Sequence, residues 1–145
     1  MGVALLDVNV LVALFYVDHV HNEAAHQWLA TERSRGWATC PVTVNGCIRV
    51  LSGSTYPQLR LQPYDVIDDL RALCASTDHH FWSDSVSVLD DSLFNHSSLR
   101  GHKQITDAYL LGLAVRNHGR LATFDRNVPI AAVKGARPSN LAFIG

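Results

Sequence analysis

The sequence lacks the features that mark several familiar classes of protein. Its three cysteines, Cys40, Cys47 and Cys74, are an odd number without CxxC or other paired spacing, so reduced buried thiols are expected rather than disulfides or a zinc site. No apolar run reaches the ~18 residues that a membrane-spanning helix needs. The apolar start has no basic stretch before it and is interrupted by Asp7, so no signal peptide is expected. We therefore expect a cytoplasmic protein without a membrane segment.

Sequence motifs of two large enzyme classes are also missing. There is no GxGxxG or Walker loop for nucleotide binding and no Gly-x-Ser-x-Gly elbow of a serine hydrolase. The charged share is only 17% against 48% hydrophobic residues, which favours a compact globule over a disordered chain. A length of 145 residues suits one domain, which we place at residues 1–145.

Charge is divided unequally along the chain. Residues 1–95 hold 5 Lys and Arg against 11 Asp and Glu, whereas residues 96–145 hold 7 against 2. The basic residues of the second part are Arg100, Lys103, Arg116, Arg120, Arg126, Lys134 and Arg137. Such a patch could meet a phosphate backbone, and an ordinary solvated face is the alternative.

Hydrophobic patterns predict strands that alternate with helices. Strands are expected at about 3–6, 37–41, 120–124 and 140–144, and helices at about 10–16, 21–32, 43–51, 63–74 and 106–118. Segments 80–82 and 86–89 are short pieces of less certain type, and 92–102 is a polar loop or short helix. Asn9 is expected to cap the first helix and Gly119 to end the last. The alternation predicts an α/β fold with parallel strands.

Three aspartates fall where strand-like runs give way to a helix or turn. Asp7 follows the first strand, and Asp107 lies in the first turn of the last helix. Asp125 comes directly after the strand expected at 120–124. Such positions gather at the carboxyl end of a parallel sheet. Close carboxylates repel one another unless a hard cation such as Mg²⁺ or Mn²⁺ neutralises them. Singly, each has a structural alternative: a helix cap, a favourable helix-dipole contact or an Asx turn.

The same stretches resemble a known family. Leu5-Leu6-Asp7-Val8-Asn9, Ile105-Thr106-Asp107-Ala108-Tyr109-Leu110 and Ala122-Thr123-Phe124-Asp125-Arg126 are similar to the PIN-domain ribonucleases, and above all to VapC toxins. The resemblance runs from about residue 3 to 141. It implies a PIN-like α/β domain with a central parallel sheet flanked by helices. It also implies an endoribonuclease of a type II toxin–antitoxin pair, which cuts cellular RNA with a metal-activated water. A cognate VapB-type antitoxin and a homodimer would be its partners.

The resemblance assigns roles to particular residues. Asp7 and Asp107 would hold Mg²⁺ or Mn²⁺, with Asp125 as a direct or water-mediated ligand. Three further residues, which would orient the acids or face the substrate, are Asn9, Thr106 and Thr123. Four basic residues that could position the RNA backbone are Arg49, Lys103, Arg116 and Arg126.

One position departs from the family pattern. In the run Thr43-Val44-Asn45-Gly46, similar proteins usually have Glu where this chain has Val44. No other acid occurs between Glu32 and Asp65. The loss of a carboxylate should weaken cation binding. The alternative function is therefore a catalytically weakened chain that acts mainly as an antitoxin- and RNA-binding module.

Two further alternatives are open from the residues alone. The histidines His19, His21 and His26, and the pair His79-His80, offer a rival metal site, but their spacing is not that of HExxH and no Cys or Glu completes a zinc set. A phosphatase of the haloacid-dehalogenase type would begin with Asp-x-Asp, where this chain has Asn9 in the second place. Both alternatives rank below the ribonuclease.

Overall fold

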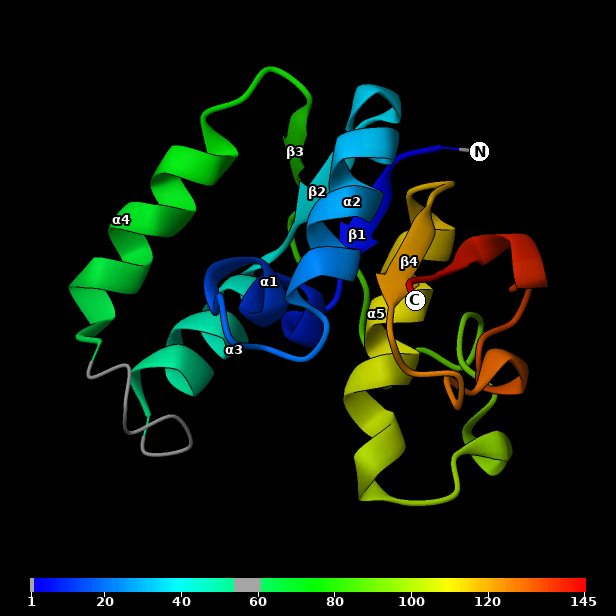
Figure 1. Cartoon of the computed structure of the whole chain (residues 1–145). Coiled ribbons are helices and arrows are strands. Elements are labelled where there is room, and N and C mark those ends of the chain that lie inside the picture. The colour runs from blue at the N-terminus through cyan, green and yellow to red at the C-terminus, as the bar shows by residue number, and fades with distance from the viewer. Residues whose placement is uncertain (1, 54–60) are drawn as a thin grey trace.

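A five-stranded parallel sheet forms the centre of the computed structural model, which describes residues 2–53 and 61–145. The strands are β1 (Ala4–Leu6), β2 (Trp37–Thr39), β3 (His79–Phe81), β4 (Arg120–Thr123) and β5 (Leu141–Phe143). They lie in the order β3-β2-β1-β4-β5, and each neighbouring pair is parallel. This arrangement, with helices around the sheet, confirms the predicted α/β fold (Figure 1).

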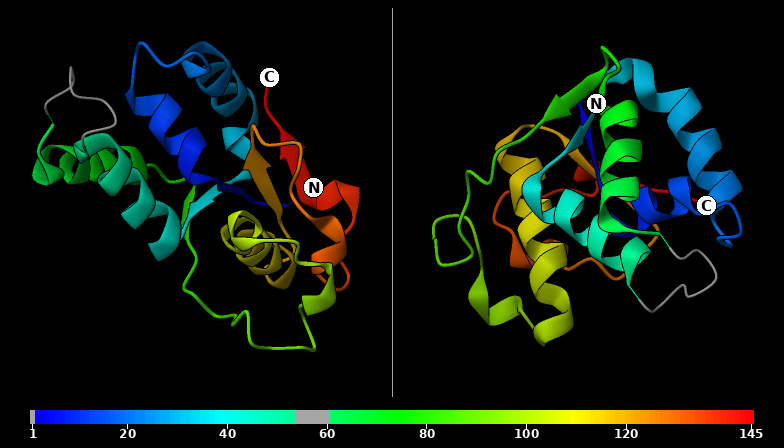
Figure 2. Two further views of the ribbon diagram at one scale, coloured as in Figure 1. Left: turned by 90° about the horizontal axis from the view of Figure 1, so that it is seen from below. Right: turned by 90° about the vertical axis from the view of Figure 1, so that its left-hand side faces the viewer.

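Helices cover both faces of the sheet. The helices are α1 (Val8–Phe15), α2 (Asn22–Glu32), α3 (Pro41–Ser52), α4 (Pro63–Cys74) and α5 (Ile105–Arg116). Figure 2 shows α5 on the opposite side of the sheet from α1 and α2. Successive strand residues point to opposite faces. Leu6 therefore packs in the cluster formed with α1 to α4, and Leu5 packs with α5.

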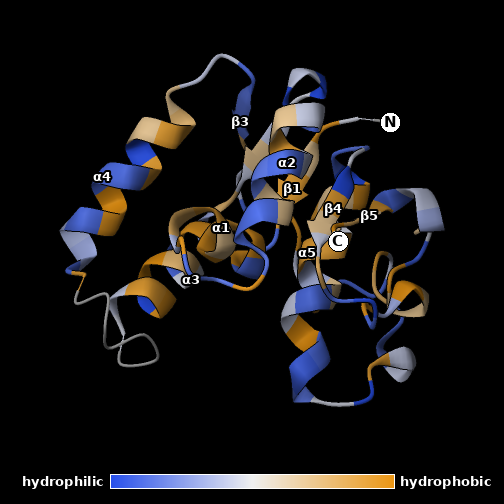
Figure 3. Cartoon of the chain, in the orientation of Figure 1, coloured by the Kyte–Doolittle hydropathy of each residue, from blue (hydrophilic) through white to orange (hydrophobic). Residues whose placement is uncertain are grey.

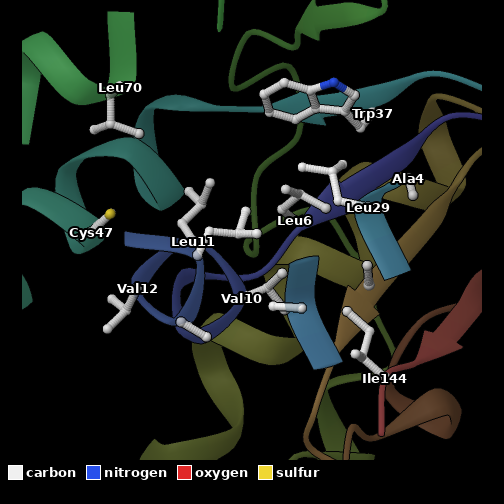
Figure 4. Packing of buried hydrophobic residues seen from close by; sticks show 14 of the residues in the cluster. Ala4, Leu6, Val10, Leu11, Val12, Leu29, Trp37, Cys47, Leu70 and Ile144 are labelled. Atoms are coloured by element: carbon white, nitrogen blue, oxygen red, sulfur yellow. The ribbon is translucent and has the colours of Figure 1, made fainter. Parts of the chain in front are cut away.

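The two apolar clusters account for the position of each helix. Leu6, Leu11 and Trp37 lie in the first cluster, where they are no more than 1% exposed (Figure 4). Figure 3 shows β1 mainly in hydrophobic colours, whereas α2 and α4 mix hydrophilic and hydrophobic residues. Helices of this kind bury one face and leave the other in water. In the described ranges, no helix has the length and apolar character that a bilayer span requires.

The expected elements agree closely with the structure, apart from two local details. The helix predicted at 63–74 is α4, segment 80–82 overlaps β3, and 86–89 lies in a loop. The first correction concerns Asn9: α1 begins at Val8 and its N-cap is Asp7, so Asn9 lies within the first turn.

The second correction concerns the end of α5. The residue with a left-handed backbone is His118, with φ 57°, and the Gly119 N–H bonds to Ala114 O at 2.8 Å. Gly119 is needed for space instead, because a Cβ there would lie 2.4 Å from Val3 O. The helix therefore ends in a Schellman turn that uses a histidine where glycine is usual.

The thiols are free, as predicted. Cys40 and Cys47 are buried and Cys74 is partly buried. Burial raises the pKa of the Cys47 thiol to about 12, so this side chain stays protonated and behaves as a small apolar group.

Candidate active site

Asp7 is a buried carboxylate at the carboxyl end of β1. It is 6% exposed, its Oδ1 accepts a hydrogen bond from Val8 N at 2.7 Å, and its Oδ2 accepts one from Thr123 Oγ1 at 2.8 Å. Burial raises the pKa of Asp7, these two hydrogen bonds lower it, and the charge of Asp125 raises it further. None of the ion pairs among the described residues includes Asp7. Its negative charge is therefore held by dipoles and has no cationic partner within the described ranges.

The pKa of Asp107 depends on both of the other acids. It lies in the first turn of α5, partly buried. Burial raises the pKa of Asp107 to about 7, with further contributions from the charges of Asp7 and Asp125 and from a hydrogen bond with Asp125. Such charge effects act over a few ångströms. The structure thus brings these three carboxyl groups, which are distant in sequence, to one end of the sheet.

Thr123 connects two of the acids. Its hydroxyl donates to Asp7 Oδ2 and accepts from the Asp125 backbone N–H at 3.0 Å. Asp125 also accepts a hydrogen bond from Asn127 N at 2.8 Å, so the Asx turn that was the structural alternative for Asp125 is present. The turn does not use all of the acceptor capacity of the carboxylate, because each oxygen can take more than one bond.

The basic residues lie at different distances from this end of the sheet. Lys103 is exposed in the short helix η3 (His102–Gln104) that leads into α5, and Arg49 is exposed on α3. The Arg126 guanidinium lies 4.8 Å from the ring centroid of Phe143. Arg116 is at the opposite end of α5, about 13 Å along the helix axis from Asp107, and pairs with Asp90 at 4.0 Å. Lys103, four residues before Asp107, and Arg126, next to Asp125, are therefore better placed than Arg116 to reach RNA bound at the acids.

The position of the missing glutamate lies in an apolar pocket. Val44 lines a pocket of about 210 Å³ between α3 and α4, together with Ile48, Ile67 and Leu70. None of the three aspartates lines this pocket. In the described structure, Val44 thus contributes to packing between helices, and a carboxylate there would enter a mainly apolar pocket that Arg71 and His79 also line.

The rival histidine site does not form. His19 Nδ1 accepts a hydrogen bond from His21 N at 3.0 Å, and His26 Nε2 lies 2.8 Å from Leu14 O. His79 Nε2 lies 2.8 Å from Thr39 Oγ1. Over residues 2–53 and 61–145, no group of three or more His, Cys, Asp or Glu side chains is arranged to hold a metal ion. This finding includes the three aspartates, which couple electrostatically without forming a ready-made coordination site.

One group of residues near the acids was not anticipated from the sequence. A pocket of about 380 Å³ is lined by Asn9, His19, His21, Phe124 and Asp125. The His21 ring stacks on Phe124 with centroids 4.4 Å apart and 20° between planes, and His19 is 6.4 Å from Phe124 at 23°. Burial, and then the neighbouring His21, lower the pKa of His19. The sequence signal was the adjacency of Phe124 to Asp125, but nothing in the sequence indicated that residues 19–21 meet them.

Comparison with known proteins identifies the family. The PIN domain model matches residues 4–134. Ribonuclease VapC44 of Mycobacterium tuberculosis is 46% identical over 142 residues, which cover 96% of this chain and 97% of the relative. Ribonuclease VapC39 of the same species is 39% identical over 132 residues, covering 91% and 95%.

A solved structure supports the fold. The crystal structure of Mycobacterium tuberculosis VapC20, described as a Sarcin-Ricin loop cleaving toxin, matches with a TM-score of 0.61 and 13% sequence identity. The match covers 93% of this chain and 99% of that one. At this identity it bears on the fold alone, whereas the sequence relatives carry the family assignment. As the resemblance predicted, the chain belongs to the PIN-domain family and, within it, to the VapC ribonucleases.

Proposed function

We propose that this chain is the toxin of a type II toxin–antitoxin pair, an endoribonuclease that hydrolyses cellular RNA with Mg²⁺ or Mn²⁺. Membership of the VapC family supports the ribonuclease activity. The observation that supports the site is Asp7, a carboxylate only 6% exposed whose pKa is raised by burial and by a second acid. A buried charge of this kind costs free energy unless a partner compensates it.

The donor set fits a hard divalent cation. Carboxylate oxygens are the ligands that Mg²⁺ and Mn²⁺ prefer. The pKa of Asp107, about 7, reflects burial first and then the negative charges of Asp7 and Asp125, which a cation would offset. Asp7 and Asp107 would hold the ion, with Asp125 as a direct or water-mediated ligand. When bound, the cation would lower the pKa of a water molecule and offset charge on the scissile phosphate.

The chain's own residues orient the acids. Thr123 and the Val8 amide fix the two oxygens of Asp7, so this carboxylate does not need to reorganise when substrate arrives. The same Thr123 hydroxyl accepts a hydrogen bond from the Asp125 backbone N–H and keeps that turn beside Asp7. Thr106, exposed next to Asp107, and Asn9 would face the substrate.

RNA would approach this end of the sheet through its phosphates. Exposed Lys103, Arg49 and Arg126 can offset backbone charge near the acids, and Arg116 can do so farther along α5. A VapB-type antitoxin would block the same acidic groove, and the toxin would act in the cytoplasm as a homodimer.

Cleavage of a labelled single-stranded RNA tests the proposal. The purified protein should cut the RNA in Mn²⁺ or Mg²⁺, stop in EDTA, and leave 5′-phosphate and 3′-hydroxyl ends, because water is the nucleophile. Products with a 2′,3′-cyclic phosphate, or cleavage that continues unchanged in EDTA, would contradict the metal-dependent reaction.

A second candidate function follows from Val44. In this candidate function the chain keeps its fold and binds RNA and antitoxin while hydrolysing little, since the family usually has Glu at this place. Restoring the acid by Val44→Glu distinguishes the two candidates. A large rise in cleavage would show that the missing carboxylate limits the chain, whereas lower stability without a rise would agree with the apolar pocket around Val44.

A further inference from the structure

The pocket beside Asp125 combines flat rings with a hydrogen-bonding side chain. His19 and His21 reach it from the segment between α1 and α2, Phe124 and Asp125 follow β4, and Asn9 comes from the first turn of α1. All five side chains are at least partly exposed, so the rings are accessible from solvent. A pocket of about 380 Å³ falls in the range of small-ligand sites.

The rings are held in place before any ligand arrives. His21 stacks on Phe124 at 4.4 Å, and Tyr16 packs edge-on to His19 at 6.3 Å. The His21 N–H donates to His19 Nδ1, so a neutral His19 carries its proton on Nε2. Nearby, the Asn9 amide offers both donor and acceptor groups, which can read the edge of a base.

The lining favours a neutral flat ligand over an anion. Asp125 is the charged carboxylate of the pocket, and none of the Lys and Arg side chains in the described part of the chain lines it, so a phosphate would be repelled here. Nucleobases are uncharged and stack on aromatic side chains, which is how single-stranded RNA is commonly bound. Asp125 belongs to the group of acids, so a base in this pocket would set its own phosphate near them.

We propose that the pocket of Asn9, His19, His21, Phe124 and Asp125 binds one unpaired RNA base, stacked on its rings, and thereby positions the neighbouring phosphate at the acids. The proposal rests on the ribonuclease function proposed above and adds a substrate subsite to it. His19, His21 and Phe124 are then positioning residues rather than catalytic ones.

Binding without cleavage provides the test. Fluorescence anisotropy in EDTA measures the Kd of three labelled decamers: oligo(rU), oligo(rA) and an abasic ribose-phosphate chain of equal charge. The wild-type protein should bind at least one base-containing decamer about 10-fold or more tightly than the abasic chain. His21→Ala should remove most of this advantage and leave the abasic Kd unchanged, and His21→Phe should restore it. His21 makes no side-chain cap bond to α2, so its replacement removes no helix cap.

A matched control and an activity assay separate the possible failures. His80→Ala removes an exposed histidine of β3, outside this pocket, and should leave every Kd as in the wild type. Equal wild-type affinity for abasic and base-containing chains would overturn the base pocket, as expected if it receives a protein side chain instead. If that result comes with metal-dependent cleavage, the ribonuclease proposal survives. Base preference that depends on His21 without cleavage in Mn²⁺ would overturn the ribonuclease proposal alone.

Discussion

The pKa values of aspartates shift in opposite directions at the two ends of the parallel sheet. At the amino end of β3, Asp78 accepts hydrogen bonds from Arg33 Nε at 2.9 Å, Ser76 Oγ at 2.6 Å and Trp37 Nε1 at 3.0 Å. The Arg33 contact above all holds the pKa of Asp78 well below its usual range. At the carboxyl end of the sheet, burial raises the pKa values of Asp7 and Asp107, and the other acids there raise them further.

The acids at the amino end of the sheet stabilise the fold, whereas the clustered acids at the carboxyl end destabilise it. The charge of Asp78 is satisfied within the chain, and so is that of Glu32, which pairs with Arg120 at 3.1 Å near the start of β4. Asp7 instead accepts bonds from the neutral Thr123 hydroxyl and a backbone amide. Clusters of this kind are typical of functional sites, whose unfavourable electrostatics are offset by stability elsewhere in the fold.

The largest expected effect comes from removing the charge of Asp7. Asp7→Asn should lower the rate of RNA cleavage by at least ~100-fold, since it removes a proposed ligand of the cation. It should leave the melting temperature equal or higher, because a buried charge disappears. Asp78→Asn is the matched control and should do the reverse, with a lower melting temperature and activity retained per folded molecule. Equal activity of Asp7→Asn and wild type would remove the distinction between the two ends.

The fold was predictable because its signals are local. Short apolar runs and helical spacing gave the positions of β1, β4, α4 and α5 within a few residues. The grouping of the three acids was predictable for a different reason, which does not depend on local signals: parallel strands share one carboxyl end.

Features that depend on how distant segments meet were not predictable. Residues 19–21 contact Phe124 only in the folded chain, so the aromatic pocket had no local sign. Sequence reasoning also gave the capping role to Asn9, because it treated Asp7 as either a cap or a functional acid. The structure shows that Asp7 caps α1 and also lies close enough to Asp125 for the charge of Asp125 to raise its pKa.

A bound cation should raise the stability of the protein through the acids at the carboxyl end of the sheet, and not through Asp78. At 100 times its Kd, Mn²⁺ or Mg²⁺ should raise the free energy of unfolding by about 2.7 kcal/mol through mass action. Thermal denaturation across a metal titration measures the effect. Asp7→Asn should abolish it, and Asp78→Asn should preserve it from a lower starting point. An equal metal-induced shift in Asp7→Asn would place the cation elsewhere.

Removing the paired charge of Glu32, at the amino end of the sheet, should lower the free energy of unfolding by somewhat less than the cation raises it. Glu32→Ala removes the carboxylate that Arg120 and Arg35 share. The Arg120 side chain is 9% exposed, and its Nε has no partner among the described residues. The expected loss is roughly 2 kcal/mol in urea unfolding, below the value for fully buried pairs because Glu32 is 20% exposed. Glu23→Ala, at an exposed position of the same helix, is the control and should change little. Reduced cleavage per folded molecule in Glu32→Ala would contradict its purely structural role.

The two ends of the sheet should also differ in the sign of their pH dependence. In EDTA, the folded pKa of Asp107 is about 7 against an ordinary 3.8, so between these values the native state holds a proton that the unfolded chain has lost. Its contribution to stability is full below about pH 4, declines as the pH rises and is gone above about pH 7. The depressed pKa of Asp78 acts in the other direction, and its contribution is lost as the pH falls below about 4.

Urea midpoints of wild type and Asp107→Asn, measured from pH 4 to 8, isolate the first contribution. The stability of the variant relative to the wild type should increase as the pH rises to about 7 and stay constant above that pH. Saturating Mg²⁺ should remove this trend from the wild type, because a cation at the acids favours their ionised forms and thereby returns the pKa of Asp107 toward its ordinary value. If the difference between the two proteins is independent of pH in EDTA, neither burial nor the neighbouring acids raise the pKa of Asp107, and the contrast between the ends of the sheet reduces to Asp7 alone.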